Sequence, residues 1–114
     1  MTQPLRILVV DDDHNSREGL AELLGQAGHV VEACRAGLRA LDVLGAGPYD
    51  VLLTDLVMPG MTGLELIRTA RRTNPQLRCF LMTGHTPTDE PDIQWIAKPI
   101  DFDLLLARLE DHAR

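Results

Sequence analysis

Short apolar runs alternate along the chain with longer segments that have helical periodicity. The runs are continuous rather than alternating, which is typical of strands buried on both faces of a sheet. The segments between them place apolar side chains three and four positions apart, which predicts helices with one buried face. The predicted strands are residues 5–10, 30–34, 51–54, 79–82 and 94–97. The predicted helices are residues 15–27, 36–44 and 63–72, and a last one capped by Asp101. This alternation predicts right-handed βαβ units and a central parallel sheet, an α/β fold.

Local signals mark the ends of the first predicted helix. Asn15 and Glu18 have the spacing of a capping box, and Gly28 is placed to end the helix. The apolar face that we expect to point toward the core consists of Leu20, Leu23, Leu24 and Ala27.

One interval breaks the rhythm of strands and helices. Only eleven residues separate Met82 from Gln94, and two of them are Pro87 and Pro91. A crossover between parallel strands usually takes a dozen or more residues, commonly with a helix among them. We therefore predict that the fourth helix of the pattern is missing or reduced to about one turn.

Length and composition predict one globular domain spanning residues 1–114. Hydrophobic residues make up 45% and charged residues 25%, as in ordinary globular proteins. The net charge of −6 argues against nucleic acid as a partner, because binding to phosphates needs a basic stripe. Cys34 and Cys79 lie within predicted strands, and we expect two buried free thiols.

The apolar runs also bear on location. They are far shorter than the roughly 20 residues that cross a bilayer, so no membrane association is expected. No long apolar stretch precedes the first acidic residues, which argues against a signal peptide. We expect a cytoplasmic protein, and because the sequence stops soon after the last predicted helix, we expect no output domain on this chain.

Charged residues gather where the predicted strands end. The first strand runs into Asp11, Asp12 and Asp13, the third runs into Asp55, and the fifth runs into Lys98, the only lysine of the chain. The carboxyl ends of parallel strands form one crevice, where ligands bind in open α/β sheets. We therefore expect these carboxylates and this ammonium group to converge on a site built around one nucleophilic aspartate.

Such a cluster needs a cation. Two carboxylates ~4 Å apart repel by about 4 kcal/mol at an effective dielectric constant near 20. Oxygen ligands with room for water suit Mg²⁺, and three carboxylates balance Mg²⁺ plus Lys98. The simpler interpretation is that Asp11, Asp12 and Asp13 only cap the following helix. We expect Asp13 to form the cap, and the other two to hold the metal.

Four motifs in order, "ILVVDDD", "LLTDLVMPGMTGLEL", "FLMTG" and "AKPI", resemble the receiver domain of two-component response regulators, including receivers attached to hybrid histidine kinases. The resemblance covers nearly the whole chain. It implies a flavodoxin-like, doubly wound fold with a five-stranded parallel sheet in the order 2-1-3-4-5. It also implies a phosphorelay protein that takes a phosphoryl group from a sensor histidine kinase or a histidine phosphotransfer protein. The downstream partner stays open.

The resemblance assigns roles to the residues at the strand ends. Asp55 is the implied phosphoacceptor. Mg²⁺ (or Mn²⁺) is held by Asp12, Asp55 and the backbone carbonyl of Val57, with Asp11 acting through water. Lys98 stabilises the phosphoryl oxygens, and Pro99 takes the position of a cis peptide that aims Lys98. Such a domain catalyses its own Mg²⁺-dependent phosphorylation and dephosphorylation but acts mainly as a signalling switch.

Further positions correspond to the switch and to the control of hydrolysis. Thr83 is placed to hydrogen-bond the phosphoryl group, and Trp95 takes the aromatic switch position, although a curtailed fourth helix leaves it to cover exposed sheet instead. Gly84 leaves the approach to Asp55 open. Val57 and His85 take the positions that gate water. An apolar Val57 cannot orient water, so we predict slow self-dephosphorylation.

The segment after Asp55 reads as a tight turn into the third helix, with Met58, Pro59, Gly60 and Gly63. The methionines of this turn, Met58 and Met61, are interpreted as packing residues, the alternative being a partner-binding patch.

Three alternative functions compete with the phosphoacceptor. A degenerate receiver would act only as a docking module, independently of phosphorylation; the complete set of acids, threonine and lysine argues against it. A phosphatase with an aspartate nucleophile needs a D-x-D-x-T pattern, whereas His14 and Asn15 follow Asp13. An FMN carrier needs a Ser/Thr-rich phosphate loop after the first strand, and the sequence has none there.

Overall fold

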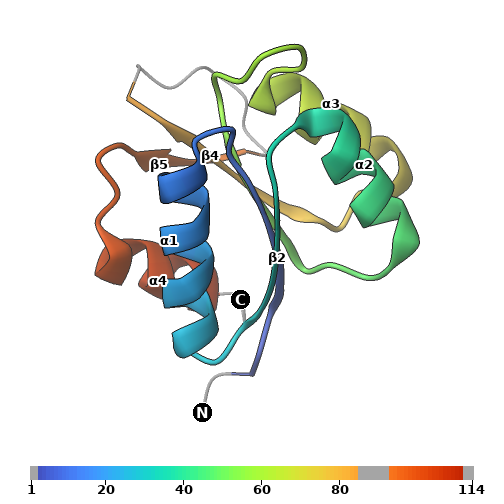
Figure 1. Ribbon diagram of the computed structural model, residues 1–114. Helices are drawn as coiled ribbons and strands as arrows, with labels where there is room; N and C mark the ends of the chain where they lie inside the picture. Colours follow the sequence, from blue (N-terminus) through green and yellow to red (C-terminus); the bar gives the residue numbers. More distant parts are fainter. Residues whose placement is uncertain (1–2, 85–92, 112–114) are drawn as a thin grey trace.

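The computed structural model describes residues 3–84 and 93–111 and contains one five-stranded parallel sheet (Figure 1). The strands are β1 (Arg6–Val10), β2 (Val30–Cys34), β3 (Val51–Asp55), β4 (Arg78–Thr83) and β5 (Gln94–Ala97). Their order in the sheet is β2-β1-β3-β4-β5. This is the doubly wound, flavodoxin-like order, so the predicted fold class is confirmed.

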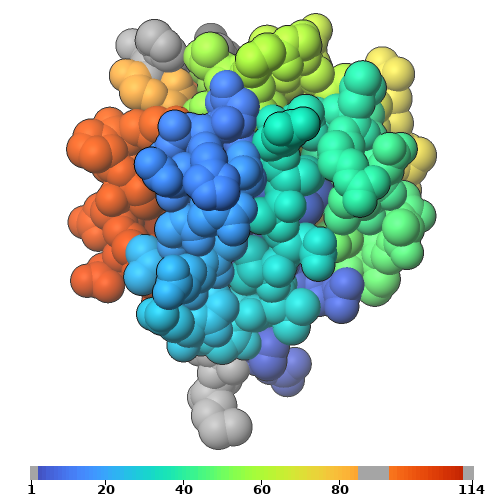
Figure 2. Space-filling view, in the orientation of Figure 1, coloured from blue at the N-terminus to red at the C-terminus, as the bar shows by residue number. Residues whose placement is uncertain are grey.

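Four helices cover the two faces of the sheet among the described residues. They are α1 (His14–Gln26), α2 (Gly37–Ala46), α3 (Gly63–Thr73) and α4 (Phe102–Glu110). Helices α1 and α4 lie on one face, and α2 and α3 lie on the other (Figures 1 and 2). The interval between Met82 and Gln94, for which we predict at most one helical turn, lies mostly on residues 85–92, outside the described part of the chain.

The continuous apolar runs are explained by burial on both faces of the sheet. Every residue of β3 is buried, and its side chains alternate between two apolar clusters. Leu52 joins the cluster under α2 and α3, whereas Leu53 joins the cluster under α1 and α4. Cys34 and Cys79 are buried free thiols, as predicted. Within the described ranges, no helix has the length and apolar character needed to span a bilayer.

The start of α1 differs from the prediction. Its N-cap is Asp13, whose carboxylate accepts a hydrogen bond from the Ser16 backbone N–H at 2.9 Å. The predicted capping box of Asn15 and Glu18 is therefore wrong, because the helix begins earlier in the chain and Asn15 already lies within its first turn. The expectation that Asp13 forms the cap is confirmed.

The predicted apolar face of α1 is also too wide. Leu24 is fully buried, but Leu23 is 44% exposed and Ala27 lies on the surface. The core therefore contacts only a narrow stripe of this helix. Gly28 ends the helix as predicted, with φ of +101°, in the left-handed region that favours glycine.

Candidate functional site

The three acids of the predicted site converge because β1 and β3 are neighbours. Val10 pairs with Thr54 in the sheet, so Asp11 and Asp55, the next residues along each strand, lie side by side. Carboxylate oxygens of Asp11, Asp12 and Asp55 lie within 4.8 Å of one another. Asp11 and Asp55 are buried, whereas Asp12 is exposed. One side of the cluster is thus fixed by the core, and the other side is open to solvent.

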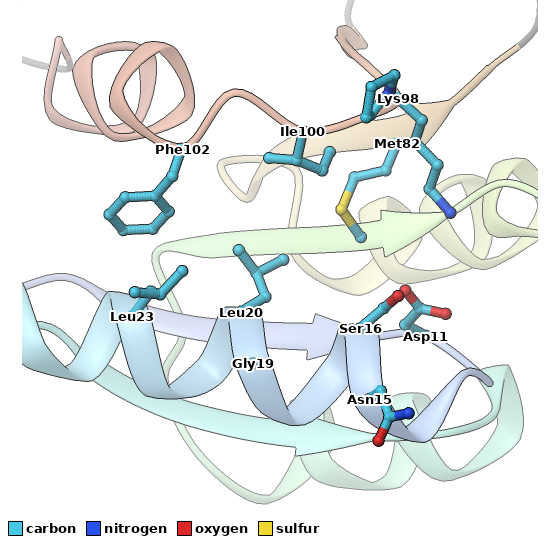
Figure 3. A pocket seen from close by; sticks show the side chains of 11 residues that line it. Asp11, Asn15, Ser16, Gly19, Leu20, Leu23, Met82, Lys98, Ile100 and Phe102 are labelled. Carbon is cyan, nitrogen blue, oxygen red and sulfur yellow. The ribbon is translucent and has the colours of Figure 1, made fainter.

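Lys98 reaches this cluster from the far side of the site. Its Nζ lies 2.6 Å from Asp55 Oδ1, although β4 separates β5 from β3 in the sheet. The Lys98 backbone N–H donates to the carbonyl of Thr83 at 3.0 Å, which continues the β4–β5 pairing by one residue. The Lys98–Pro99 peptide bond is cis. In Figure 3 the ammonium end of Lys98 points toward Asp11 from the opposite wall.

Burial and repulsion oppose ionisation of Asp11. Desolvation raises the pKa of its carboxyl above the ordinary value, and the nearby Asp55 charge adds to this effect. A hydrogen bond from the Asp13 backbone N–H to Asp11 Oδ1, 3.0 Å long, acts in the opposite direction without cancelling it. The pKa of Asp13 is lowered instead, because the Ser16 backbone N–H and side chain stabilise its charged form. These neighbouring acids therefore have different environments.

The arrangement fits a hard divalent cation. Three carboxylates bring three negative charges together, and Lys98 supplies one positive charge within contact distance of Asp55. A divalent cation would neutralise the remaining two charges. Oxygen ligands with an exposed side that admits water are the coordination that Mg²⁺ prefers. The described residues offer these three carboxylates as candidate ligands.

The remaining predicted site residues lie on or just after β3, β4 and β5, or outside the described residues. Thr83 is buried at the end of β4, and Gly84 follows it on the surface. The Val57 side chain is 63% exposed just after Asp55. Trp95, half-buried on β5, packs against the apolar cluster under α2 and α3. His85 falls on the residues that the structure does not describe.

The site requires glycine at position 63, and the sequence indicates this only in part. A side-chain Cβ at this position would lie 2.1 Å from the Asp55 carbonyl oxygen, so only glycine fits. The Gly63 N–H donates to the Leu56 carbonyl at 2.9 Å, which draws the start of α3 onto the end of β3. The sequence suggests a tight turn here, but only the structure shows which backbone atom Gly63 must approach.

Arg17 is a supporting residue that the sequence analysis missed. It lies on α1 and donates from Nη1 to the Asp11 carbonyl at 3.0 Å. Its Nε also contacts the Glu18 carboxylate at 3.1 Å. Arg17 thus fixes the backbone that carries Asp11 and Asp12. A single arginine on a predicted helix gives no sequence signal of this contact.

An apolar groove of about 370 Å³ opens beside the acids, between α1 and the segment that follows β5 (Figure 3). Leu20 and Leu23 of α1 form one wall, and Ile100 and Phe102 face them across the groove. Asp11 and Lys98 lie at one end. The exposed side chain of Leu23 therefore belongs to a surface that is continuous with the charged site.

Comparison with known proteins adds a sequence match over most of the chain. The family described as response regulator receiver domain matches residues 7–110. The response regulator MprA of Mycobacterium sp. (strain KMS) is 34% identical over 113 residues, which cover 93% of this chain and 49% of that protein. The chain thus spans about half the length of the relatives it matches.

Solved structures agree with the sequence match. The receiver domain of the hybrid histidine kinase CckA has a TM-score of 0.85 and 30% identity, over 96% of this chain and 99% of that one. The response regulator TrrA of Thermotoga maritima, solved in complex with Mg²⁺-BeF, has a TM-score of 0.83 and 32% identity, over 92% and 96% of the two chains. TrrA has also been solved in complex with the histidine kinase ThkA.

Proposed function

Because the chain belongs to the response regulator receiver domain family of two-component signalling, we propose that Asp55 accepts a phosphoryl group from a phosphohistidine. The donor is a sensor histidine kinase or a histidine phosphotransfer protein. The observation that carries this proposal is the position of Lys98 Nζ, 2.6 Å from an Asp55 carboxylate that lies among two further acids. This close approach of Lys98 to the carboxylate supports Asp55 as the nucleophile.

In the proposed reaction, an Asp55 carboxylate oxygen attacks phosphorus in line with the phosphorus–nitrogen bond. The new phosphorus–oxygen bond forms as the phosphorus–nitrogen bond breaks. The electron pair of the phosphorus–nitrogen bond returns to the donor imidazole. Positioning and neutralisation of charge account for most of the catalysis in such transfers. Lys98 would pair with a phosphoryl oxygen, and the Thr83 hydroxyl would donate a hydrogen bond to another.

The proposed metal ligands are Asp12, Asp55 and the Val57 carbonyl, with Asp11 bound through water. Mg²⁺, or Mn²⁺ in its place, would neutralise the phosphoryl charge when bound. Asp11 has the complementary task of holding the Asp13 backbone N–H, which fixes the loop that carries Asp12. Asp11 and Asp12 are therefore held in position both by β1, which they follow, and by the N-cap of α1.

The groove beside the acids supports the proposed partner. Its apolar walls suit an apolar side chain on a kinase helix, and with Asp11 and Lys98 at its end a phosphohistidine on that helix would lie near Asp55. Leu23, 44% exposed, provides contact area at the outer part of the groove. Because kinases make phosphohistidine from ATP, we place this exchange in the cytoplasm.

The test is mass spectrometry of the chain after incubation with acetyl phosphate and Mg²⁺. We expect one phosphoryl group on Asp55, its loss in Asp55→Asn, and unchanged labelling in the control Asp42→Asn, which removes an exposed acid of α2. Labelling of the wild-type chain on another residue, or no labelling at all, would contradict the phosphoacceptor assignment. The second of these results would favour the phosphorylation-independent docking module.

A further inference from the structure

A second groove, of about 500 Å³, lies on the other face of the sheet from α1. It is formed by α2, α3 and the loop that leads into α3, which lie side by side in Figure 1. Leu38 of α2 lines it on one side, Arg68 and Arg72 of α3 line it on the other, and Gly60 and Met61 of the loop close one end. None of these side chains is used by the proposed phosphoryl transfer.

The apolar part of this groove is unusually accessible. Leu38 is 70% exposed, the largest exposed fraction among the large hydrophobic residues of the described chain. Met61 lies half-buried beside it, against the first turn of α2. A Cβ at Gly37 would lie only 2.7 Å from Met61 Sδ. The absence of a side chain at Gly37 therefore leaves room for Met61. Leu38 and Met61 thus form an apolar surface that a partner side chain can cover.

The charge of the groove favours an acidic partner. Arg68 and Arg72 are both exposed and lie four positions apart on α3, where like charges repel. The helix dipole favours Arg72 in the last turn of α3. Among the described residues that line the groove, Glu65 is the one acid. A chain with a net charge of −6 therefore presents a locally basic surface here.

The groove is also physically connected to the acidic site. Residues 56–62 join Asp55 to α3, and Gly60 and Met61 of this loop line the groove. The loop begins at Leu56, whose N–H donates to the Met82 carbonyl, and it ends where Gly63 donates to Leu56. Val57, whose carbonyl is a proposed metal ligand, lies within the same loop. A change of state at Asp55 can therefore reach the groove through a few residues.

We propose that the α2–α3 groove is a docking surface for an acidic segment of a partner protein that inserts an apolar side chain against Leu38 and Met61. We further propose that its occupancy is coupled to phosphorylation of Asp55 through residues 56–62. The coupling rests on the proposed function, whereas binding to the groove does not. Such a surface would pass the phosphorylation signal to a partner protein without any contribution from the segment between β4 and β5.

The binding test uses a fluorescently labelled amphipathic helical peptide with a leucine stripe flanked by glutamates, and the same peptide with lysines in place of the glutamates. We expect the acidic peptide to bind and to perturb the backbone amide resonances of Leu38, Met61 and Thr69. Leu38→Ser and Arg72→Glu should each weaken binding by about fivefold or more. Arg39→Glu is the matched control, because this exposed arginine of α2 lines a different pocket.

Several results would overturn the docking surface. One is equal binding of the two peptides, and another is equal loss of affinity in the Arg39→Glu control. Competition by a DNA oligonucleotide at equal affinity would assign the basic surface to nucleic acid instead.

The coupling test repeats the titration with Mg²⁺ and beryllium fluoride, a phosphoryl mimic. We expect the peptide affinity to change by about fivefold, and Asp55→Asn to remove this change while it keeps the binding itself. Unchanged affinity in a chain whose Asp55 resonances show the mimic bound would overturn the coupling. If the mimic does not bind, the proposed function fails, while the peptide titration still decides the docking surface.

Discussion

Replacing Asp11 with asparagine tests the electrostatic account of the site. Asparagine keeps the side-chain oxygen that accepts the Asp13 N–H, and it removes the charge that burial and Asp55 disfavour. We therefore expect Asp11→Asn to stabilise the metal-free protein. This is an unusual sign for a substitution at a buried functional position, since most substitutions destabilise.

The size of the effect follows from the geometry. Two carboxylates whose oxygens lie within 4.8 Å repel by about 3.5 kcal/mol at an effective dielectric constant of 20. The attraction of Lys98 to Asp11 opposes this, and solvent at the exposed side of the cluster screens both interactions. We expect a net stabilisation of about 1–2 kcal/mol at neutral pH and low salt.

Urea unfolding with and without Mg²⁺ provides the assay. In EDTA the variant should have the higher free energy of unfolding. Metal at 100 times its dissociation constant stabilises the native state by about 2.7 kcal/mol, and the variant should gain less because it binds the ion more weakly. The difference between the two proteins should therefore shrink or change sign when Mg²⁺ is added.

The pH dependence has a defined sign. Because the pKa of Asp11 is raised in the folded state, its neutral form favours folding, and this contribution is full below the ordinary value of 3.8. It is lost as the pH rises through the raised pKa. The advantage of Asp11→Asn in EDTA should therefore be absent in acid, appear above pH 3.8 and level off above the raised pKa.

Asp13→Asn is the matched control, because asparagine caps a helix about as well as aspartate and Asp13 lies outside the cluster. Its stability should respond little to Mg²⁺. The electrostatic account would be refuted if Asp11→Asn were less stable than the wild type in EDTA, or if Mg²⁺ stabilised both proteins equally.

Three further predictions concern the framework. Gly63→Ala should destabilise the fold by about 3 kcal/mol or more, because the new Cβ would lie 2.1 Å from the Asp55 carbonyl oxygen. Gly19→Ala, in α1 with no atom within 4 Å of the new Cβ, should stabilise the fold by about 1 kcal/mol. Equal unfolding midpoints for the wild type and the two variants would contradict both predictions. His29→Ala should cost about 2–4 kcal/mol in thermal or urea unfolding, because the buried ring accepts the Leu5 N–H at 3.0 Å and leaves a cavity when removed; an effect below about 1 kcal/mol would mean that water replaces the ring.

Several features of the fold were predictable because they depend on local pattern. The continuous apolar runs predicted strands buried on both faces, and β3 is buried at every residue. Asp101 caps α4 as predicted, with its carboxylate accepting the Leu104 N–H at 3.2 Å. The resemblance of four motifs added the strand order, which periodicity alone does not determine.

The predictions about α1 were wrong where a local sequence pattern was overridden by the tertiary structure. Asn15 and Glu18 have a valid capping spacing, but Asp13 satisfies the first turn of α1 earlier. Leu23 fits the helical period of an apolar face, yet it is 44% exposed and lines the groove that Ile100 and Phe102 face. Periodicity gives the direction of a side chain around its helix, but it does not say how closely a neighbouring segment packs against it.

The sequence by itself determined the element types, because periodicity, caps and turn residues act over a few neighbours. It also determined that acids and the single lysine follow apolar strands. Only the tertiary structure decided that Lys98 Nζ lies 2.6 Å from Asp55, that Gly63 must approach the Asp55 carbonyl, and that two grooves open on opposite faces. Those distances depend on sheet register and on helix packing between segments remote in the chain, and no local pattern encodes them.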